Sequence, residues 1–219
     1  SQDLGEEFFK FQIDNKLLSD LPDNPWEHYQ NLLNTKSPQE AYLWLAQINA
    51  GKPYVQLQKW VTQFLESISP LDTFEFQSKV IEFLRQCGVK VYVLSSSLKC
   101  ITELAASQFG IPAEQVIGVQ TYIKNGFITT EPVGPSTWKT EKIEGLLSLT
   151  NGKRPFFCAG NLTSDLPLLE GASHIHLVVN SAQKSDNDNY ENEKELVNIA
   201  KTNNWLYFCP PSTEFKKSA

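Results

Sequence analysis

Apolar residues in the first third of the chain recur at helical spacing. Between Leu4 and Leu18 most of them are three or four positions apart, and the segment from Pro22 to Pro25 then breaks the pattern. Similar patterns follow, and Ser-Pro pairs mark where one helix begins and where another has ended. The expected helices cover residues 4–18, 26–33, 38–51, 60–65 and 74–86. We therefore expect a small helical unit, rich in aromatic residues, at the start of the chain.

After the fifth expected helix, the spacing changes to short apolar runs. Val89 to Ser95 is a β-branched run, a polar turn follows it, and a helical pattern then extends to Gly110. Two more runs cover Pro155 to Ala159 and His174 to Val179, and residues 205–209 are expected to form a last edge strand. Strand, turn and helix with roughly 30 residues between strands is typical of βαβ units, which form parallel sheets. The sequence predicts an α/β fold, with helices on both faces of a parallel sheet.

A β-hairpin is expected to interrupt this alternation. Val116 to Ile123 and Phe127 to Thr130 flank the pair Asn125-Gly126, which is the strongest short-range signal for a two-residue hairpin turn. A helix over Thr140 to Leu149 follows the hairpin and leads back to the sheet. The polar tract from Gln183 to Glu195 is expected to be a solvated loop that runs into a helix.

The composition is that of an ordinary globular protein with an acidic balance. The 219 residues are 41% hydrophobic and 20% charged, and the formal net charge is −6. This charge argues against nucleic acid or an anionic membrane as a partner, and no apolar run approaches the roughly 18 residues of a membrane span. The four cysteines show no paired spacing, and no third metal ligand lies near His174 and His176. We expect free thiols and a cytoplasmic location, with a periplasmic or secreted protein as the alternative.

Hard oxygen donors gather where the strand ending at Ala159 meets the next helix. Asn161 and Asp165 lie four residues apart, with the hydroxyl groups of Thr163 and Ser164 between them. A loop at the carboxyl end of a buried strand is where open α/β sheets bind ligands. Mg²⁺ usually takes only one or two carboxylates and fills its other positions with water and substrate phosphate. The sequence therefore predicts a Mg²⁺ site at Asn161 and Asp165.

Two other segments carry groups that suit a phosphate. Ser95, Ser96 and Ser97 end the first expected strand, where hydroxyls and free backbone N–H groups can form a phosphate cradle. An ordinary serine-rich helix cap is the structural alternative. Lys139 and Lys142, at the start of the helix after the hairpin, could neutralise phosphate charge, and the alternative for each is a surface lysine.

Together these segments resemble the haloacid dehalogenase superfamily of phosphatases, close to its phosphoserine-phosphatase-like branch. VYVLSSS resembles the second motif of the family, with Ser95 as the phosphate-binding hydroxyl. TEKIEGL resembles the lysine motif, which fits best with Lys142, and AGNLTSDLPLLEGA resembles the acidic motif, with Asn161 and Asp165 as metal ligands. The segment VIGVQTYIKNGFITT matches the hairpin that this branch carries between its second and third motifs.

The resemblance implies a Rossmann-like core domain over residues 73–219 and a helical cap domain over residues 1–72. It also implies a Mg²⁺-dependent phosphatase that hydrolyses a small phosphorylated metabolite. In the family, an aspartate attacks phosphorus to form an aspartyl-phosphate, which divides the hydrolysis into two easier steps. Ser96 and Ser97 would help to bind the phosphate, and Glu6 in the cap would meet a cationic group of the substrate, such as an amine or choline.

The sequence departs from the family in two places. Asn161 stands where the family usually has a metal-ligating aspartate, so the site has one negative charge fewer. The nucleophile motif DxDxT is absent from the 219 residues, and SQDLGEEFFKFQIDN resembles the segment that follows it in the family. We therefore expect an apolar strand ending in DxDxT directly upstream of Ser1, between the strands that end at Ser95 and Ala159. The alternative is a catalytically impaired relative that binds a phosphorylated ligand or a protein partner.

Overall fold

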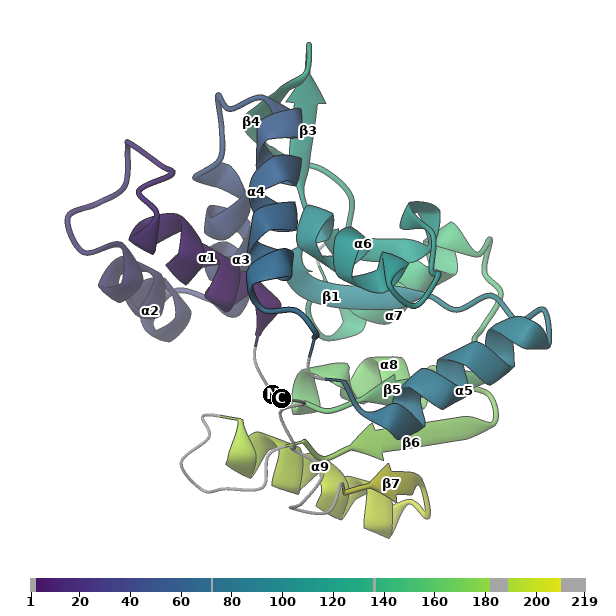
Figure 1. Ribbon diagram of the computed structural model, residues 1–219. Coiled ribbons are helices and arrows are strands. Elements are labelled where there is room, and N and C mark those ends of the chain that lie inside the picture. The colour runs from purple at the N-terminus through teal and green to yellow at the C-terminus, as the bar shows by residue number, and fades with distance from the viewer. Residues whose placement is uncertain (1–2, 72, 136, 182–188, 210–219) are drawn as a thin grey trace. The chain divides into compact units, whose positions relative to one another are not determined.

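The structure is a computed structural model that describes residues 3–71, 73–135, 137–181 and 189–209 (Figure 1). These residues divide into two compact units, one up to Thr137 and the other from Trp138 onward. Within the described ranges, no helix is both long enough and apolar enough to cross a membrane.

The first unit combines helices, two parallel strands and a hairpin. Its helices are α1 (Leu4–Asp14), α2 (Pro25–Thr35), α3 (Pro38–Gln47), α4 (Tyr54–Ser67), α5 (Glu75–Gln86) and α6 (Lys99–Ser107), and its strands are β1 (Val93–Leu98), β2 (Val116–Val119), β3 (Thr121–Lys124) and β4 (Phe127–Pro132). Local sequence explains where α3 begins. Ser37 caps α3, because its side chain accepts a hydrogen bond of 3.2 Å from the backbone N–H of Glu40, and Pro38 fills the first helical position.

Two buried clusters hold the helices of this unit. Phe9 and Tyr29 belong to one cluster among α1, α2 and α3. Phe8, Trp60 and Ile101 belong to another, which joins α1 and α4 to β1 and α6. The helices before residue 72 thus share part of their core with the segment that follows them. Along the sequence, the division between the compact units falls after residue 137. The expected cap over 1–72 and core over 73–219 stay a prediction.

The strands β1 and β2 pair in parallel, with α6 connecting them. Val93 lies opposite Val116, which is the first residue of β2, so residues before Val93 have no strand partner there. For this reason the observed strand β1 begins later than the strand expected over Val89 to Ser95, and the three serines lie inside β1. The expected strand over Val116 to Ile123 is also wrong in extent. It consists of β2, in the parallel sheet, and β3, in the hairpin.

The hairpin turn is confirmed at the predicted residues. Asn125 and Gly126 have φ angles of 53° and 84°, as a two-residue type I′ turn requires. Lys124 and Phe127 pair directly on either side of it. The segment between α3 and α4 docks on this hairpin, because the N–H of Gly51 donates to the carbonyl oxygen of Ile128 at 2.8 Å. The hairpin is therefore anchored to the helices of its own unit.

The second unit is built on a three-stranded parallel sheet in the order β5-β6-β7. Its elements are α7 (Thr140–Leu149), β5 (Phe157–Gly160), the 3₁₀ turn η2 (Thr163–Asp165), α8 (Leu166–Glu170), β6 (Ile175–Val179), α9 (Tyr190–Thr202) and β7 (Leu206–Phe208). Helix α9 packs against β6 and β7, and Leu177, Val178 and Leu196 are buried in this layer. The predicted edge strand is β7. Part of the tract 183–195 lies outside the described residues, and α9 begins at Tyr190.

Among the described strands, β1 pairs only with β2, and β5 pairs only with β6. Each of these two strands thus has one edge without a partner strand in the described part of its unit. Buried strand edges need hydrogen-bond partners, since an unpaired buried backbone group costs about 1–3 kcal/mol. The strand expected upstream of Ser1 stays a prediction.

Candidate active site

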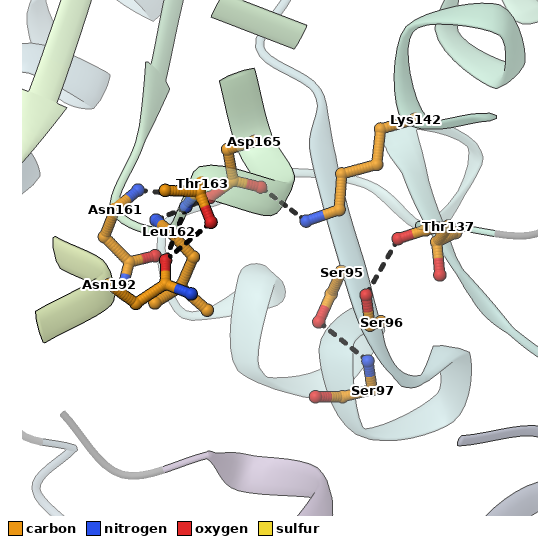
Figure 2. A network of polar contacts seen from close by, with 10 residues as sticks. All are labelled: Ser95, Ser96, Ser97, Thr137, Lys142, Asn161, Leu162, Thr163, Asp165 and Asn192. Atoms are coloured by element: carbon orange, nitrogen blue, oxygen red, sulfur yellow. Dashed lines mark hydrogen bonds and ion pairs between the residues drawn. The ribbon is translucent and has the colours of Figure 1, made fainter. Parts of the chain in front are cut away.

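A buried ion pair lies beyond the carboxyl end of β5. Lys142 comes from the first turn of α7, and Asp165 is the last residue of the turn η2. The Nζ atom of Lys142 lies 2.5 Å from Oδ1 of Asp165, and each side chain is only 9% exposed (Figure 2). Removing two charges from water is costly, so such a pair depends on further hydrogen bonds. The structure brings these two candidate residues into direct contact.

The second carboxylate oxygen of Asp165 supplies those further bonds. Its Oδ2 accepts from the backbone N–H groups of Asn161, at 3.1 Å, and Leu162, at 3.2 Å. Gly160 allows this fold-back, because a Cβ atom at that position would lie 2.6 Å from Cβ of Asp165. Asp165 therefore closes the loop after β5 and holds the lysine at the same time.

The side chain of Asn161 is fixed by residues that the sequence did not single out. Its Nδ2 donates to Oε1 of Glu193 at 3.0 Å. The same carboxylate accepts from Ser181, from the backbone N–H to Oε2 and from the hydroxyl to Oε1, each at 2.6 Å. Next to it, Oδ1 of Asn192 accepts from the backbone N–H of Thr163, at 2.6 Å, and from its hydroxyl, at 2.9 Å. The first turn of α9 thus holds the loop in place.

Sequence reasoning missed Glu193 because it lies in an acidic and polar tract expected to be solvated. A signal was present in the helical spacing. Glu193 falls three and four positions before Leu196 and Val197, on the buried face of α9, and is 0% exposed. A charged residue on the apolar face of a helix requires a partner, since carboxylates are almost never fully buried without one.

The three serines belong to the first unit, and their hydroxyls make different contacts. Oγ of Ser95 accepts from the backbone N–H of Ser97 at 3.1 Å, and its own proton has no acceptor among the described residues. The Ser96 hydroxyl donates to the carbonyl oxygen of Thr137 at 2.8 Å, and that of Ser97 to Oδ1 of Asp3 at 3.3 Å. Of the three, Ser95 is best suited to hold a phosphate oxygen.

Acidic residues at the start of α1 lie beside buried tyrosines. Oδ1 of Asp3 caps the helix by accepting from the N–H groups of Gly5, at 2.8 Å, and Glu6, at 3.1 Å. The Tyr29 hydroxyl donates to Oε1 of Glu6 at 2.9 Å. Burial raises the pKa of Tyr29 far above its usual value, and the Glu6 carboxylate adds to this shift. The carboxylate of Glu6 is thus held in place by a phenol that keeps its proton.

The remaining candidates have ordinary structural surroundings. Lys139 is exposed, so the surface alternative describes it better than a phosphate-binding role. His176 stacks on Trp205, with ring centroids 4.7 Å apart, and its Nδ1 lies 2.7 Å from the carbonyl oxygen of Leu169. His174 is exposed and lies beside Ser173. Cys100 and Cys158 are buried free thiols, and Cys87 and Cys209 are exposed ones.

The donors in the loop after β5 fit Mg²⁺ in chemical kind. No group of three or more His, Cys, Asp or Glu side chains in the described part of the chain could hold a metal, but Mg²⁺ needs few protein ligands beside its waters. The nitrogen of the Asn161 amide is engaged by Glu193, which leaves Oδ1 for a metal. Both oxygens of Asp165 already accept hydrogen bonds, so Asp165 suits a water-mediated contact better than a direct one.

The fold and these residues define an α/β protein with a buried lysine–aspartate pair beyond a parallel strand. A sequence model of the haloacid dehalogenase-like hydrolases matches residues 1–170. The chain therefore belongs to that family. A comparison with curated protein sequences found no significant match.

Several solved structures share the fold. A protein of unknown function from Bordetella pertussis Tohama I aligns with a TM-score of 0.76 and 15% identity, over 94% of this chain and 91% of the other. A phosphoserine phosphohydrolase-like protein from Francisella tularensis has a TM-score of 0.53 and 14% identity, over 83% and 78%. A substrate-bound phosphoserine phosphatase has a TM-score of 0.53 and 12% identity, over 81% and 79%. At these identities the likeness concerns the fold.

Proposed function

We propose that the protein is a Mg²⁺-dependent phosphomonoester hydrolase that acts on a small phosphorylated metabolite. The observation that carries the proposal is the buried pair of Lys142 and Asp165 beyond the end of β5. Family membership supports it, because Ser95, Lys142 and the loop of Asn161 and Asp165 follow one another in the order of the family's motifs.

Each residue has a role that its contacts support. The Ser95 hydroxyl donates its free proton to a phosphate oxygen. Lys142 has three N–H donors, of which one serves Asp165, so the others can meet the phosphate. Asn161 would hold Mg²⁺ through Oδ1, and Asp165 would reach the ion through water. When bound, Mg²⁺ offsets negative charge on the transferring phosphoryl group.

The covalent step requires an aspartate nucleophile. In the proposed reaction this carboxylate attacks phosphorus, the alcohol leaves with a proton, and water then cleaves the aspartyl-phosphate. The 219 residues contain no DxDxT motif, so this role is assigned to none of them. Glu6, held by Tyr29, is the candidate for contact with a cationic group of the substrate.

A second candidate function is favoured by Asn161. An amide in place of a carboxylate lowers the negative charge of the site, which weakens the attraction for Mg²⁺. On this alternative, the protein binds a phosphorylated ligand or a protein partner without turnover. Phosphate binding without hydrolysis is the outcome that would distinguish it.

The test is turnover of a panel of phosphomonoesters by the full-length protein, with Mg²⁺ and with a chelator. The variant Lys142→Gln is expected to lower kcat by about 10²–10³-fold, as losing one group that stabilises transition-state charge does. Lys139→Gln is the matched control, since Lys139 is an exposed lysine three residues earlier. Equal activity in the two variants, or activity that survives chelation, would contradict the proposal.

A further inference from the structure

A buried carboxylate lies directly behind the proposed metal-binding amide. Glu193 is 0% exposed and comes from the first turn of α9, 32 residues after Asn161. It accepts from Asn161 at 3.0 Å and twice from Ser181 at 2.6 Å. All of these described partners are donors, which suits a carboxylate because it can only accept.

This contact determines which way the Asn161 amide faces. A carboxylate offers no proton, so the NH₂ group of Asn161 must be the end that meets Glu193. The amide is planar, and Oδ1 therefore occupies the opposite corner. An inverted amide would bring its oxygen against the Glu193 carboxylate and lose the hydrogen bond. The orientation of the amide is thus enforced by its neighbour.

We propose that Glu193 is a positioning residue that holds Asn161 with Oδ1 outward for Mg²⁺, and that this buried carboxylate is the reason position 161 carries an amide. The proposal has two parts: Mg²⁺ binding by Asn161, called the metal half, and the contact between Asn161 and Glu193, called the pairing. The metal half rests on the proposed function, but the pairing does not. An aspartate at position 161 would place two carboxylates near the present 3.0 Å separation, where like charges repel strongly in a buried site.

Replacing Glu193 by glutamine has a defined consequence for Asn161. Glutamine has one acceptor oxygen where glutamate has two, and the backbone N–H of Ser181 requires that oxygen at the position of Oε2. The new NH₂ group then faces Asn161, while the hydroxyl of Ser181 can accept from it. Asn161 must turn over to offer its oxygen, and its nitrogen then faces outward, where a cation cannot bind.

The test is a cycle of four full-length proteins: the parent, Asn161→Asp, Glu193→Gln, and the double variant. Asn161→Asp is expected to lower the melting temperature by about 3–10 °C, since it replaces a hydrogen bond with a contact between two carboxylates. Glu193→Gln should lower it less, because the turned Asn161 amide still accepts a hydrogen bond. Glu193→Gln is expected to weaken Mg²⁺ binding, measured by calorimetry, by about 10-fold or more, as loss of an orienting partner does. The double variant is expected to recover most of the lost melting temperature and to bind Mg²⁺ at least as tightly as the parent.

The matched control is Asn192→Asp. Asn192 is the neighbour of Glu193 on α9, is exposed, and acts through its oxygen as an acceptor, so this variant adds the same charge without a clash. It is expected to keep the melting temperature of the parent. An unchanged melting temperature in Asn161→Asp, or a double variant as unstable as the two singles combined, overturns the pairing.

The metal half and the pairing have separate outcomes. A parent protein that binds no Mg²⁺ overturns the metal-binding role and the proposed function with it, whereas recovery of the double variant still supports the pairing. If Asn161→Asp fails to fold, a soluble and folded double variant supports the pairing of Asn161 with Glu193 equally well. A double variant that also fails to fold overturns this pairing.

Discussion

The buried pair of Lys142 and Asp165 makes a prediction that can be compared with an exposed pair in the same chain. Lys124 and Glu131, in the hairpin, are 2.8 Å apart, but their side chains are 60% and 61% exposed. Lys142 and Asp165 are 2.5 Å apart, and each side chain is 9% exposed. The perturbation is Lys142→Met, with Lys124→Met as the matched control, because both remove one charged partner and keep an unbranched side chain.

The structure gives different magnitudes for these two changes. Breaking a buried pair costs about 3–5 kcal/mol, because the remaining charge stays buried without its partner. Two backbone N–H groups still bind Asp165, so the lower end, about 3 kcal/mol, is the better estimate. For a chain of this size that corresponds to a fall of about 6–12 °C in melting temperature. The exposed pair is worth about 0–1 kcal/mol, so Lys124→Met should lower the melting temperature by less than about 4 °C.

The assay is thermal unfolding followed by circular dichroism at neutral pH. Added salt should remove the small effect of Lys124→Met and leave the larger effect of Lys142→Met, since exposed charges are screened and buried ones are not. Lys142→Gln should fall between, because its amide can still donate to Asp165. Equal melting temperatures for Lys142→Met and Lys124→Met would refute the reasoning.

Three further predictions concern other buried contacts. Asn49→Ala should cost about 1–3 kcal/mol in urea unfolding, because it removes the 2.8 Å acceptor of the buried Gln12 amide; no change in the unfolding midpoint would contradict this. Gly160→Ala should cost about 1–3 kcal/mol, because the new Cβ would meet Asp165, whose side chain is held by three hydrogen bonds; a melting temperature equal to that of the parent would count against it. Burial raises the pKa of the Cys158 thiol to about 12, from an ordinary 9.0. This thiol should therefore resist alkylation at pH 8 until the protein unfolds, and the free energy of unfolding should fall as pH rises from 9.0 towards 12; native-state labelling of Cys158 at the rate of an exposed cysteine would be the contrary result.

Features that depend on local sequence were predicted well. The hairpin turn falls at Asn125-Gly126, because these two residues readily adopt positive φ angles. Helix α7 has the predicted bounds, Thr140–Leu149. Strand limits were predicted less well, because they depend on a partner elsewhere in the chain. The start of β1 at Val93 is fixed by the start of β2 at Val116, which no local pattern in the first strand reveals.

The candidate site divides in the same way. The family resemblance assigned Lys142 and Asp165 to the same site. The two residues are 23 positions apart in the sequence, so residue spacing alone does not predict their contact. Glu193 and Ser181 were missed, because a buried carboxylate in a polar tract becomes visible only when the helix face is known. The serines were expected at the end of a strand and lie within β1. Only the structure separates the hydroxyl of Ser95 from that of Ser96, which donates to a carbonyl oxygen.

The buried ion pair is hard to explain by stability alone. Replacing such a pair with apolar residues of similar volume is often neutral or stabilising by about 1–4 kcal/mol, because two charges lose their hydration on burial. A fold with no need for charge at this position would gain little from Lys142 and Asp165. The pair also lies where a lysine can meet a ligand, beyond the end of a parallel strand, and Asp165 uses its second oxygen to shape the loop that carries Asn161. A single carboxylate thereby couples the position of the cationic group to that of the candidate metal ligand, so a change in one is transmitted to the other. That coupling is a property which an apolar pair of equal stability could not provide.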